Sequence, residues 1–231
     1  GNESDYKIKT FDIGANYQDL TNWLMGGEFY GSINFGLGHN DYGDSPITFR
    51  DSKKNEDTNG SHTIISGTLN YTQFFTDISS ITFKFSGQHG NKNLDSSEKF
   101  YLGGARTVRA YPTSEIGGTH GFLFNIDHSY ILTDTITLNS FYDHGYVKQY
   151  KKDVNRSTNQ ALTIEGNSND VTLRGYGFSL KYLGPYDTSF EFMWSDRIGS
   201  NPNRSNANID NSNGETARPM TWFSGSINFY F

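Results

Sequence analysis

The first pattern that could do chemistry is the pair Asp143–His144, because a carboxylate beside an imidazole can orient it as a general base. The pair lies in the stretch TLNSFYDHGYV, where polar and apolar residues alternate as they do in a half-buried β-strand. Neighbouring side chains of a strand point to opposite faces, so Asp143 and His144 are expected to face apart. The sequence therefore predicts no catalytic residue at this pair and no enzymatic activity.

Metal-binding patterns are also missing from the sequence. Four histidines, His39, His62, His89 and His120, fall near predicted strand ends and lack the spacing of zinc ligands. The acidic stretch DSKKNEDTNG lacks the ligand spacing and turn glycine of a calcium loop. With no cysteine, the chain can form neither a disulfide nor a thiolate metal site. We expect no metal ion and no other cofactor.

The second candidate is Arg109, in the stretch FYLGGARTVRAYP. The guanidinium group is planar and can bind a carboxylate through two parallel hydrogen bonds. Two glycines, Gly103 and Gly104, precede it and permit the sharp backbone turns that other residues resist. What Arg109 meets depends on the elements that hold this loop.

Composition indicates which elements these are. Aromatic residues make up 16% of the 231 residues, yet all hydrophobic residues together reach only 34%. A soluble β-sandwich would carry more Val, Leu and Ile, whereas a membrane β-barrel needs apolar residues on one face only, with aromatic girdles and a polar interior. No run approaches the roughly 20 apolar residues of a transmembrane helix. The net charge of −6 argues against a nucleic-acid-binding surface.

Alternation with a period of two recurs along the chain, as in SITFKFSGQ, where Ile81, Phe83 and Phe85 oppose Thr82 and Lys84. Nine segments with this pattern are predicted to be strands: 5–18, 24–39, 62–76, 80–89, 120–132, 135–148, 170–183, 188–197 and 221–231. Each would have one apolar and one polar face.

Short and long connections alternate between these segments. The short ones, such as FTDISS and LTDTI, are rich in turn residues. The long ones are polar and cover about residues 40–61, 91–119, 148–169 and 199–219. Short turns at one rim and long loops at the other are typical of an outer-membrane barrel, with periplasmic turns and extracellular loops. A soluble up-and-down barrel is the alternative, but it gives no reason for an apolar stripe on every strand.

The strand number bears on domain organisation. Single-chain bacterial barrels have an even number of strands, whereas nine are predicted here. We therefore expect residues 1–231 to be the C-terminal part of a larger transmembrane barrel.

Two motifs resemble those of the Omp85 superfamily. FYLGGARTVRAYP resembles the VRGY-type element on the inward-folded sixth extracellular loop of these barrels, and FYDHG resembles the FxDxG element that follows two strands later. The segments MWSDRIGSNPN and TWFSGSINFYF resemble the end of the TpsB branch, the FhaC/ShlB-type transporters of two-partner secretion. One departure is Ala110, which stands where the motif usually has glycine.

The resemblance implies a fold, a location and a function. The fold is a 16-stranded barrel of the Gram-negative outer membrane, preceded by periplasmic POTRA domains that are absent from this chain. The function is to secrete a TpsA-like exoprotein, an adhesin or haemolysin, without nucleotide hydrolysis. The other partners implied are outer-membrane lipid and the barrel assembly machinery.

The resemblance also implies that residues 100–119 fold into the barrel and that Arg109 meets Asp143 there, closing a latch between loop and wall. A solvated arginine and an ordinary carboxylate of the barrel interior are the alternative. The remaining latch residues come from the two motifs: Gly103, Gly104, Val108 and Tyr111 from the loop, and Phe141 and Gly145 from the strand.

The last residues form a further candidate site. Ile227, Phe229 and Phe231 share one face of the terminal segment and resemble the C-terminal signal that the assembly machinery recognises. A strand that ends at a lipid face is also often aromatic by chance.

Other functions stay open from the sequence. Another Omp85 member, either a barrel assembly factor or an exporter of a fused passenger, would differ in its upstream domains. An unrelated porin would conduct ions steadily and secrete nothing, and a barrel enzyme is a further alternative.

Overall fold

The computed structural model describes residues 6–20, 26–163, 167–185, 187–201 and 218–227. Over these ranges the chain forms one nine-stranded antiparallel sheet in which each strand pairs with the next strand of the sheet along the chain. The strands are β1 (Lys7–Asp19), β2 (Gly27–Asp41), β3 (Gly60–Thr76), β4 (Ser79–Gly90), β7 (His120–Thr133), β8 (Ile136–Lys148), β9 (Asp170–Leu183), β10 (Ser189–Arg197) and β11 (Met220–Ser226). The predicted all-β antiparallel fold is confirmed. The strand ends lie within a few residues of those expected, while the predicted strand residues 5, 24–25 and 228–231 lie outside the described residues.

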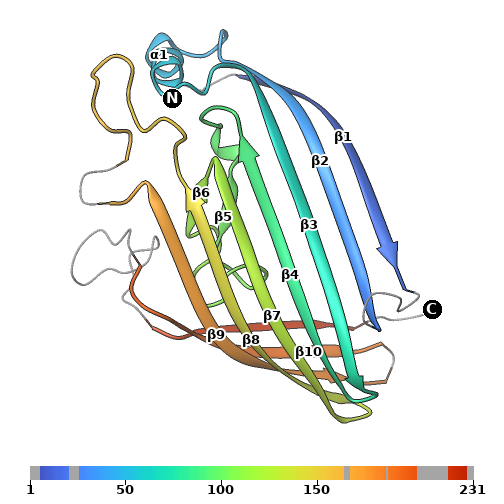
Figure 1. Cartoon of the computed structure of the whole chain (residues 1–231). Coiled ribbons are helices and arrows are strands. Elements are labelled where there is room, and N and C mark those ends of the chain that lie inside the picture. The colour runs from blue at the N-terminus through green and yellow to red at the C-terminus, as the bar shows by residue number, and fades with distance from the viewer. Residues whose placement is uncertain (1–5, 21–25, 164–166, 186, 202–217, 228–231) are drawn as a thin grey trace.

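The sheet curls around its own inner face. Figure 1 shows β1 to β4 and β7 to β9 as a curved wall and β10 and β11 running across it at a steep angle. Over the described residues, β1 and β11 are the two edges of the sheet. The arrangement is a large part of a barrel wall.

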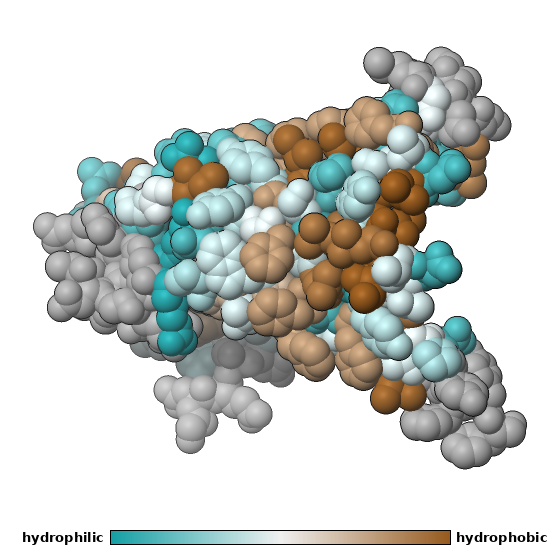
Figure 2. Space-filling model, turned by 90° about the horizontal axis from the view of Figure 1, so that it is seen from below, coloured by the Kyte–Doolittle hydropathy of each residue, from teal (hydrophilic) through white to brown (hydrophobic). Residues whose placement is uncertain are grey.

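The outer face of this wall is apolar and exposed. Large apolar side chains of one parity on the strands are exposed; Phe11, Ile33, Phe85, Phe178 and Phe192 have between 40% and 65% of their surface exposed. Aromatic rings stack across neighbouring strands, as Phe83 does on Phe124. Figure 2 shows hydrophobic side chains gathered over part of the surface, with hydrophilic ones toward its ends. An apolar outer surface of this extent matches lipid rather than water.

The two ends of the sheet differ. At one end, which we call the turn end, β3 connects to β4 and β7 to β8 through two residues each. At the other, the loop end, the connections are long and partly ordered. They contain the helix α1 (Ile47–Asn55), the 3₁₀ helix η1 (Ser96–Glu98) and the small hairpin of β5 (Phe100–Leu102) and β6 (Ile116–Gly118). The polar loops predicted at 40–61 and 91–119 therefore hold local structure that the sequence analysis did not anticipate.

No helix in the part of the chain that the structure describes is long and apolar enough to cross a membrane.

Three of the long connections hold one another at the loop end. We call residues 42–58, 91–99 and 149–163 the cap. Asp57, in the first segment, forms ion pairs with Lys92 of the second and with Lys152 and Arg156 of the third, at N···O distances of 3.7, 4.0 and 2.6 Å. The side-chain amide of Asn93 donates to the carbonyls of Glu56 and Lys152, at 2.7 and 2.8 Å. The cap is thus joined by contacts from loop to loop.

Candidate functional site: the inner loop and its latch

The connection between β4 and β7 leaves the cap after residue 99. Residues 100–119, which we call the inner loop, pass along the inner face of the sheet, and their hairpin packs on β7 and β8. Apolar side chains join the loop to the wall. The buried cluster consists of Leu102, Val108, Ala110 and Tyr111 from the loop with Leu123, Val147, Val171 and Leu173 from the wall.

Glycines make the close approach of the loop possible. Gly103 and Gly104 have φ values of +98° and +110°, a backbone region that favours glycine. Gly145, on β8, faces the loop: an added Cβ atom would lie 2.7 Å from Leu102 and 2.9 Å from Val108. The glycine of the FYDHG motif therefore clears the space that the apolar side chains of the loop occupy.

The guanidinium of Arg109 binds two carboxylates. Its Nη2 and Nε donate to Asp143 on β8, at 2.6 and 3.0 Å. Its Nη1 donates to Asp127 on β7, at 2.6 Å. The Asp143 side chain is fully buried, and the side chains of Arg109 and Asp127 are 11% and 13% exposed. Lys84, from β4, pairs with the second oxygen of Asp127 at 3.0 Å.

Polar neighbours complete the surroundings of Asp143. The backbone N–H of Arg109 donates to its Oδ2 at 2.8 Å, and the amide of Asn125 donates to its Oδ1 at 2.6 Å. Asn125 also donates to the carbonyl of Thr107, so the strand grips the loop backbone as well. A buried carboxylate requires this density of donors, because an unpaired buried charge is strongly destabilising.

The carbonyl oxygen of Arg109 is held from the opposite direction. It accepts hydrogen bonds from Ser195 Oγ on β10, at 2.7 Å, and from Trp222 Nε1 on β11, at 2.9 Å. One residue of the loop is thereby joined to four strands of the wall: β7, β8, β10 and β11.

Aromatic rings lie on the charged groups of the site. The guanidinium carbon of Arg109 is 3.5 Å from the centre of the Phe141 ring, and that of Arg197 is 4.7 Å from the centre of the Tyr111 ring. A guanidinium stacked on a ring loses part of its solvation and gains cation–π attraction. Burial by itself lowers the pKa of Arg109, but its hydrogen bonds with Asp143 and the charges of both aspartates outweigh this and raise the pKa.

The structure brings together the loop and strand residues named from the motifs. Arg109 and Phe141 contact each other, Asp143 binds Arg109, and Gly145 adjoins Val108. Their role as a functional latch stays a prediction. Of the C-terminal candidates, Phe229 and Phe231 lie outside the described residues, and Ile227 is half exposed.

Several residues of the site were not predicted. Asp127, Asn125, Ser195 and Trp222 were at most assigned to a polar or apolar face of a strand, and no spacing related them to Arg109. The apolar wall of the cluster did leave a signal: Val171 and Leu173 fall on the same face of the segment 170–183 as Gly175. Apolar residues on the inner face of a barrel strand indicate that something covers them.

Ala110 occupies the position where the motif usually has glycine, and the structure accommodates it. Its side chain is fully buried. It packs against Gly175 on β9, where an added Cβ atom would lie 2.6 Å from the Ala110 Cβ. Absence of a side chain at Gly175 therefore makes room for the methyl group of Ala110.

His144 takes no part in the site. It lies on the outer face, where its ring stacks on Phe122 with 5.9 Å between centroids, while Asp143 lies on the inner face. Within the described ranges, no group of three or more His, Asp or Glu side chains is arranged to hold a metal ion.

Comparison with known proteins adds the family. The sequence pattern of the haemolysin secretion/activation proteins ShlB/FhaC/HecB matches residues 2–173. The chain belongs to this family. The resemblance to the TpsB branch is thus confirmed, since the FhaC/ShlB-type proteins are the ones that it named.

Individual curated relatives share only part of their sequence with this chain. The heme/hemopexin transporter protein HuxB of Haemophilus influenzae is 28% identical over 130 residues, which cover 54% of this chain and 22% of that protein. The chain thus spans about a fifth of the length of the curated relatives it matches. The family and this relative are named for secretion and transport, not for catalysis.

Solved structures agree on the fold. CdiB from Escherichia coli superposes with a TM-score of 0.65 at 14% identity, over 95% of this chain and 36% of that one. CdiB from Acinetobacter baumannii gives a TM-score of 0.51, also at 14% identity, over 96% and 42%.

Proposed function

We propose that this chain supplies wall and inner loop to an outer-membrane pore that secretes a partner exoprotein by two-partner secretion. The observation that carries the proposal is the seating of residues 100–119 inside the curled sheet, with Arg109 bound to Asp143 and Asp127. A segment held there occupies the path along the inner face. Membership in the haemolysin secretion family supports the same function.

The proposal fixes an orientation and a set of partners. The apolar outer face contacts lipid, the loop end faces the outside of the cell, and the turn end faces the periplasm. The exported partner is a TpsA-like exoprotein that passes unfolded along the polar inner face. The wall performs no catalysis, and folding of the exoprotein outside supplies the driving force. The assembly machinery inserts the barrel and recognises its C-terminal strand through Ile227, Phe229 and Phe231.

Secretion of the exoprotein tests the proposal. Cells would express the complete gene product together with its exoprotein, and exoprotein in the medium would be compared for Arg109→Ala and Arg106→Ala. Arg106 is an exposed arginine of the same loop, so its replacement removes an equal charge without touching the latch. We expect secretion to fall about tenfold or more for Arg109→Ala, because Asp143 is left buried and unpaired, and to be unchanged for the control.

A charge swap makes the test specific to the pair. Arg109→Asp and Asp143→Arg are each expected to abolish secretion, and their combination to restore part of it. Equal secretion from Arg109→Ala and Arg106→Ala, at equal amounts of protein in the outer membrane, would contradict a role for the latch. Steady ion conductance without any secretion by the unaltered protein would instead identify a porin.

A further inference from the structure

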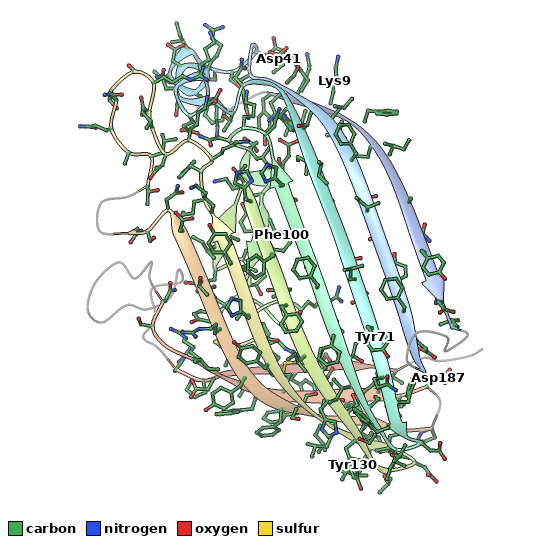
Figure 3. The ribbon with its side chains drawn as sticks, in the orientation of Figure 1. Lys9, Asp41, Tyr71, Phe100, Tyr130 and Asp187 are labelled. Carbon is green, nitrogen blue, oxygen red and sulfur yellow. The ribbon has the colours of Figure 1, made fainter. Side chains whose placement is uncertain are left out.

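Cationic side chains on the outer face of the sheet are confined to one end. By strand alternation, four lysines and arginines of the described strands face outward, and all lie in the half of their strand nearest the loop end: Lys7, Lys9, Lys148 and Arg174. Figure 3 labels Lys9 at the loop end, while Tyr71 and Tyr130 lie toward the turn end. The cations of the lipid-facing surface thus lie at its loop end, where Asp41 and Asp170, directly opposite Lys7 and Lys148, also face outward.

A pit interrupts the apolar surface just below this cationic zone. Gly67 on β3 and Gly87 on β4 are directly opposite each other in the sheet and face outward. Because neither has a side chain, they form the floor of the pit, which has a volume of about 450 Å³. Its rim consists of Ile33, Ile65, Leu69, Phe85, Phe122 and His89.

Donor groups lie at the end of the pit nearest the loops. His89 is exposed and stacks on His120 with 4.2 Å between ring centroids. His120 is directly opposite Lys148 on β8. In the part of the chain that the structure describes, Nδ1 of His120 is buried and has no hydrogen-bond partner. Lys148 has a carboxylate neighbour, Asp170, at 3.9 Å.

The carboxylate of Asp170 leaves Lys148 able to donate hydrogen bonds to a ligand. Asp170 also accepts a hydrogen bond from the hydroxyl of Tyr146, and Lys148 is 36% exposed. A lysine donates three hydrogen bonds and an imidazole one or two, and both suit a phosphate oxygen. Apolar walls with phosphate donors at one end match a molecule with an acyl chain and a phosphorylated headgroup.

A second groove repeats the design. On β1 and β2, Lys9 is directly opposite His39, whose Nδ1 lies 3.0 Å from the hydroxyl of Ser61. These residues line a groove of about 470 Å³ together with Phe11 and Leu37, which lie one step nearer the middle of the sheet. Basic donors above apolar walls therefore occur twice along the same rim.

We propose that the outer face binds a phosphorylated glycolipid of the outer leaflet, with an acyl chain in the Gly67–Gly87 pit and a phosphate at His89, His120 and Lys148. The inference rests on the membrane orientation given under the proposed function. Lysines at the edge of an apolar membrane surface attract anionic headgroups, while their carbon stems stay on the apolar side. Secretion itself is not required for this binding.

Lipid retention in detergent tests the site. The complete gene product, purified free of lipid, would be mixed with diphosphoryl lipid A or with its dephosphorylated form, and bound lipid counted by native mass spectrometry. We expect the diphosphoryl form to be retained about tenfold better, and His89→Gln with His120→Gln to reduce that preference. His128→Gln is the matched control, because His128 lies on the same strand at the turn end, bonded to Ser79.

Filling the pit tests the acyl-chain half. At Gly87 an added Cβ atom has 3.3 Å to the nearest backbone oxygen, so Gly87→Leu is tolerated with a small shift and projects into the groove. We expect it to reduce retention of both lipid forms, with unchanged β-sheet circular dichroism. Equal retention of the two lipid forms, or equal loss in the His128→Gln control, would overturn the proposal. Neither result bears on secretion, so failure here is distinguishable from failure of the proposed function.

Discussion

The latch of the inner loop and the ion-pair cluster of the cap use the same chemistry in different surroundings. In the latch, Arg109 and Asp143 have side chains that are 11% and 0% exposed. In the cap, Asp57 is nearly as buried, at 12%, but its partners Arg156 and Lys152 are 57% and 68% exposed. The latch also joins a loop to strands, whereas the cap joins loops to one another.

The difference in burial determines how strongly each cluster of ion pairs stabilises the position of its loops. Removing one partner of a buried pair leaves the other charge without solvent, which costs about 3–5 kcal/mol, whereas an exposed pair contributes about 0–1 kcal/mol. We therefore expect the latch to hold its loop more firmly than the ion pairs of Asp57 hold the loops of the cap. We infer that release of the inner loop requires something to replace the contacts of Arg109.

The largest expected effect comes from Asp143→Asn, which removes the charge that Arg109 meets. We expect the loop to lose about 3–5 kcal/mol of its preference for the seated position. Because the chain has no cysteine, spin labels at Arg106→Cys and Lys181→Cys can report the distance from loop to wall by pulsed EPR. A broadened distance distribution in Asp143→Asn is the predicted result. An unchanged distribution would show that the apolar cluster alone holds the loop.

A smaller effect is expected from packing. Gly175→Ala places a methyl group against Ala110, and overpacking of this kind costs about 1–3 kcal/mol. Combining it with Ala110→Gly should recover part of the loss, because the two positions contact each other. The measurement is a double-mutant cycle on the same label distance. Strictly additive effects of the two changes would contradict the predicted contact.

Removing the central charge of the cap should change less. Asp57 has a φ of +62°, which asparagine tolerates, so Asp57→Asn tests charge without backbone strain. We expect a loss of no more than about 1 kcal/mol, since two of its three cationic partners are well exposed. Faster proteolysis of residues 149–163, with an unaltered label distance for the inner loop, is the expected outcome. A shift of the inner loop would mean that the two clusters are coupled.

Mild acid should have the smallest effect. Burial raises the pKa of Asp95, but the hydrogen bond from Tyr42, the donors of Ser97 and the charge of Lys53 together lower it below the ordinary value of 3.8. Its stabilising contribution is therefore fully present above pH 3.8 and is lost as the pH falls through the lower folded value. A spin label at Lys54→Cys, in α1, should keep its mobility from pH 7 to about pH 5 and gain mobility only below about pH 4. A label at Asp77→Cys, in a turn outside the cap, is the control, and a transition near neutral pH would contradict this assignment.

Local features could be predicted from the sequence, whereas features that depend on contacts between distant segments could not. Strands were located to within a few residues because each must alternate between lipid and interior, and alternation is a local property. The helix α1 was missed: it has no buried residue and no side-chain N-cap, and it depends on contacts such as that of Lys53 with Asp95. A helix of nine residues is marginal without such support.

In the site, the two motifs predicted Arg109 and Asp143. They do not contain the partners on β7, β10 and β11, so those partners were not predicted. Asp127 and Asn125 are ordinary polar residues on the inner face until the curl of the sheet brings the loop to them. The role of Trp222 could not be predicted, because its indole N–H donates to a backbone carbonyl oxygen, and every residue has a backbone carbonyl.

The hydrogen bonds to the carbonyl oxygen of Arg109 constrain the order in which the barrel folds. The carbonyl of Arg109 receives its two hydrogen bonds from residues 86 and 113 positions further along the chain. Contacts so distant in sequence form late, after the intervening strands have paired. The loop can therefore be fully seated only once β10 and β11 are in the wall, so a chain interrupted before Trp222 leaves it incompletely fastened. A fully seated loop therefore indicates that β10 and β11 have already joined the wall.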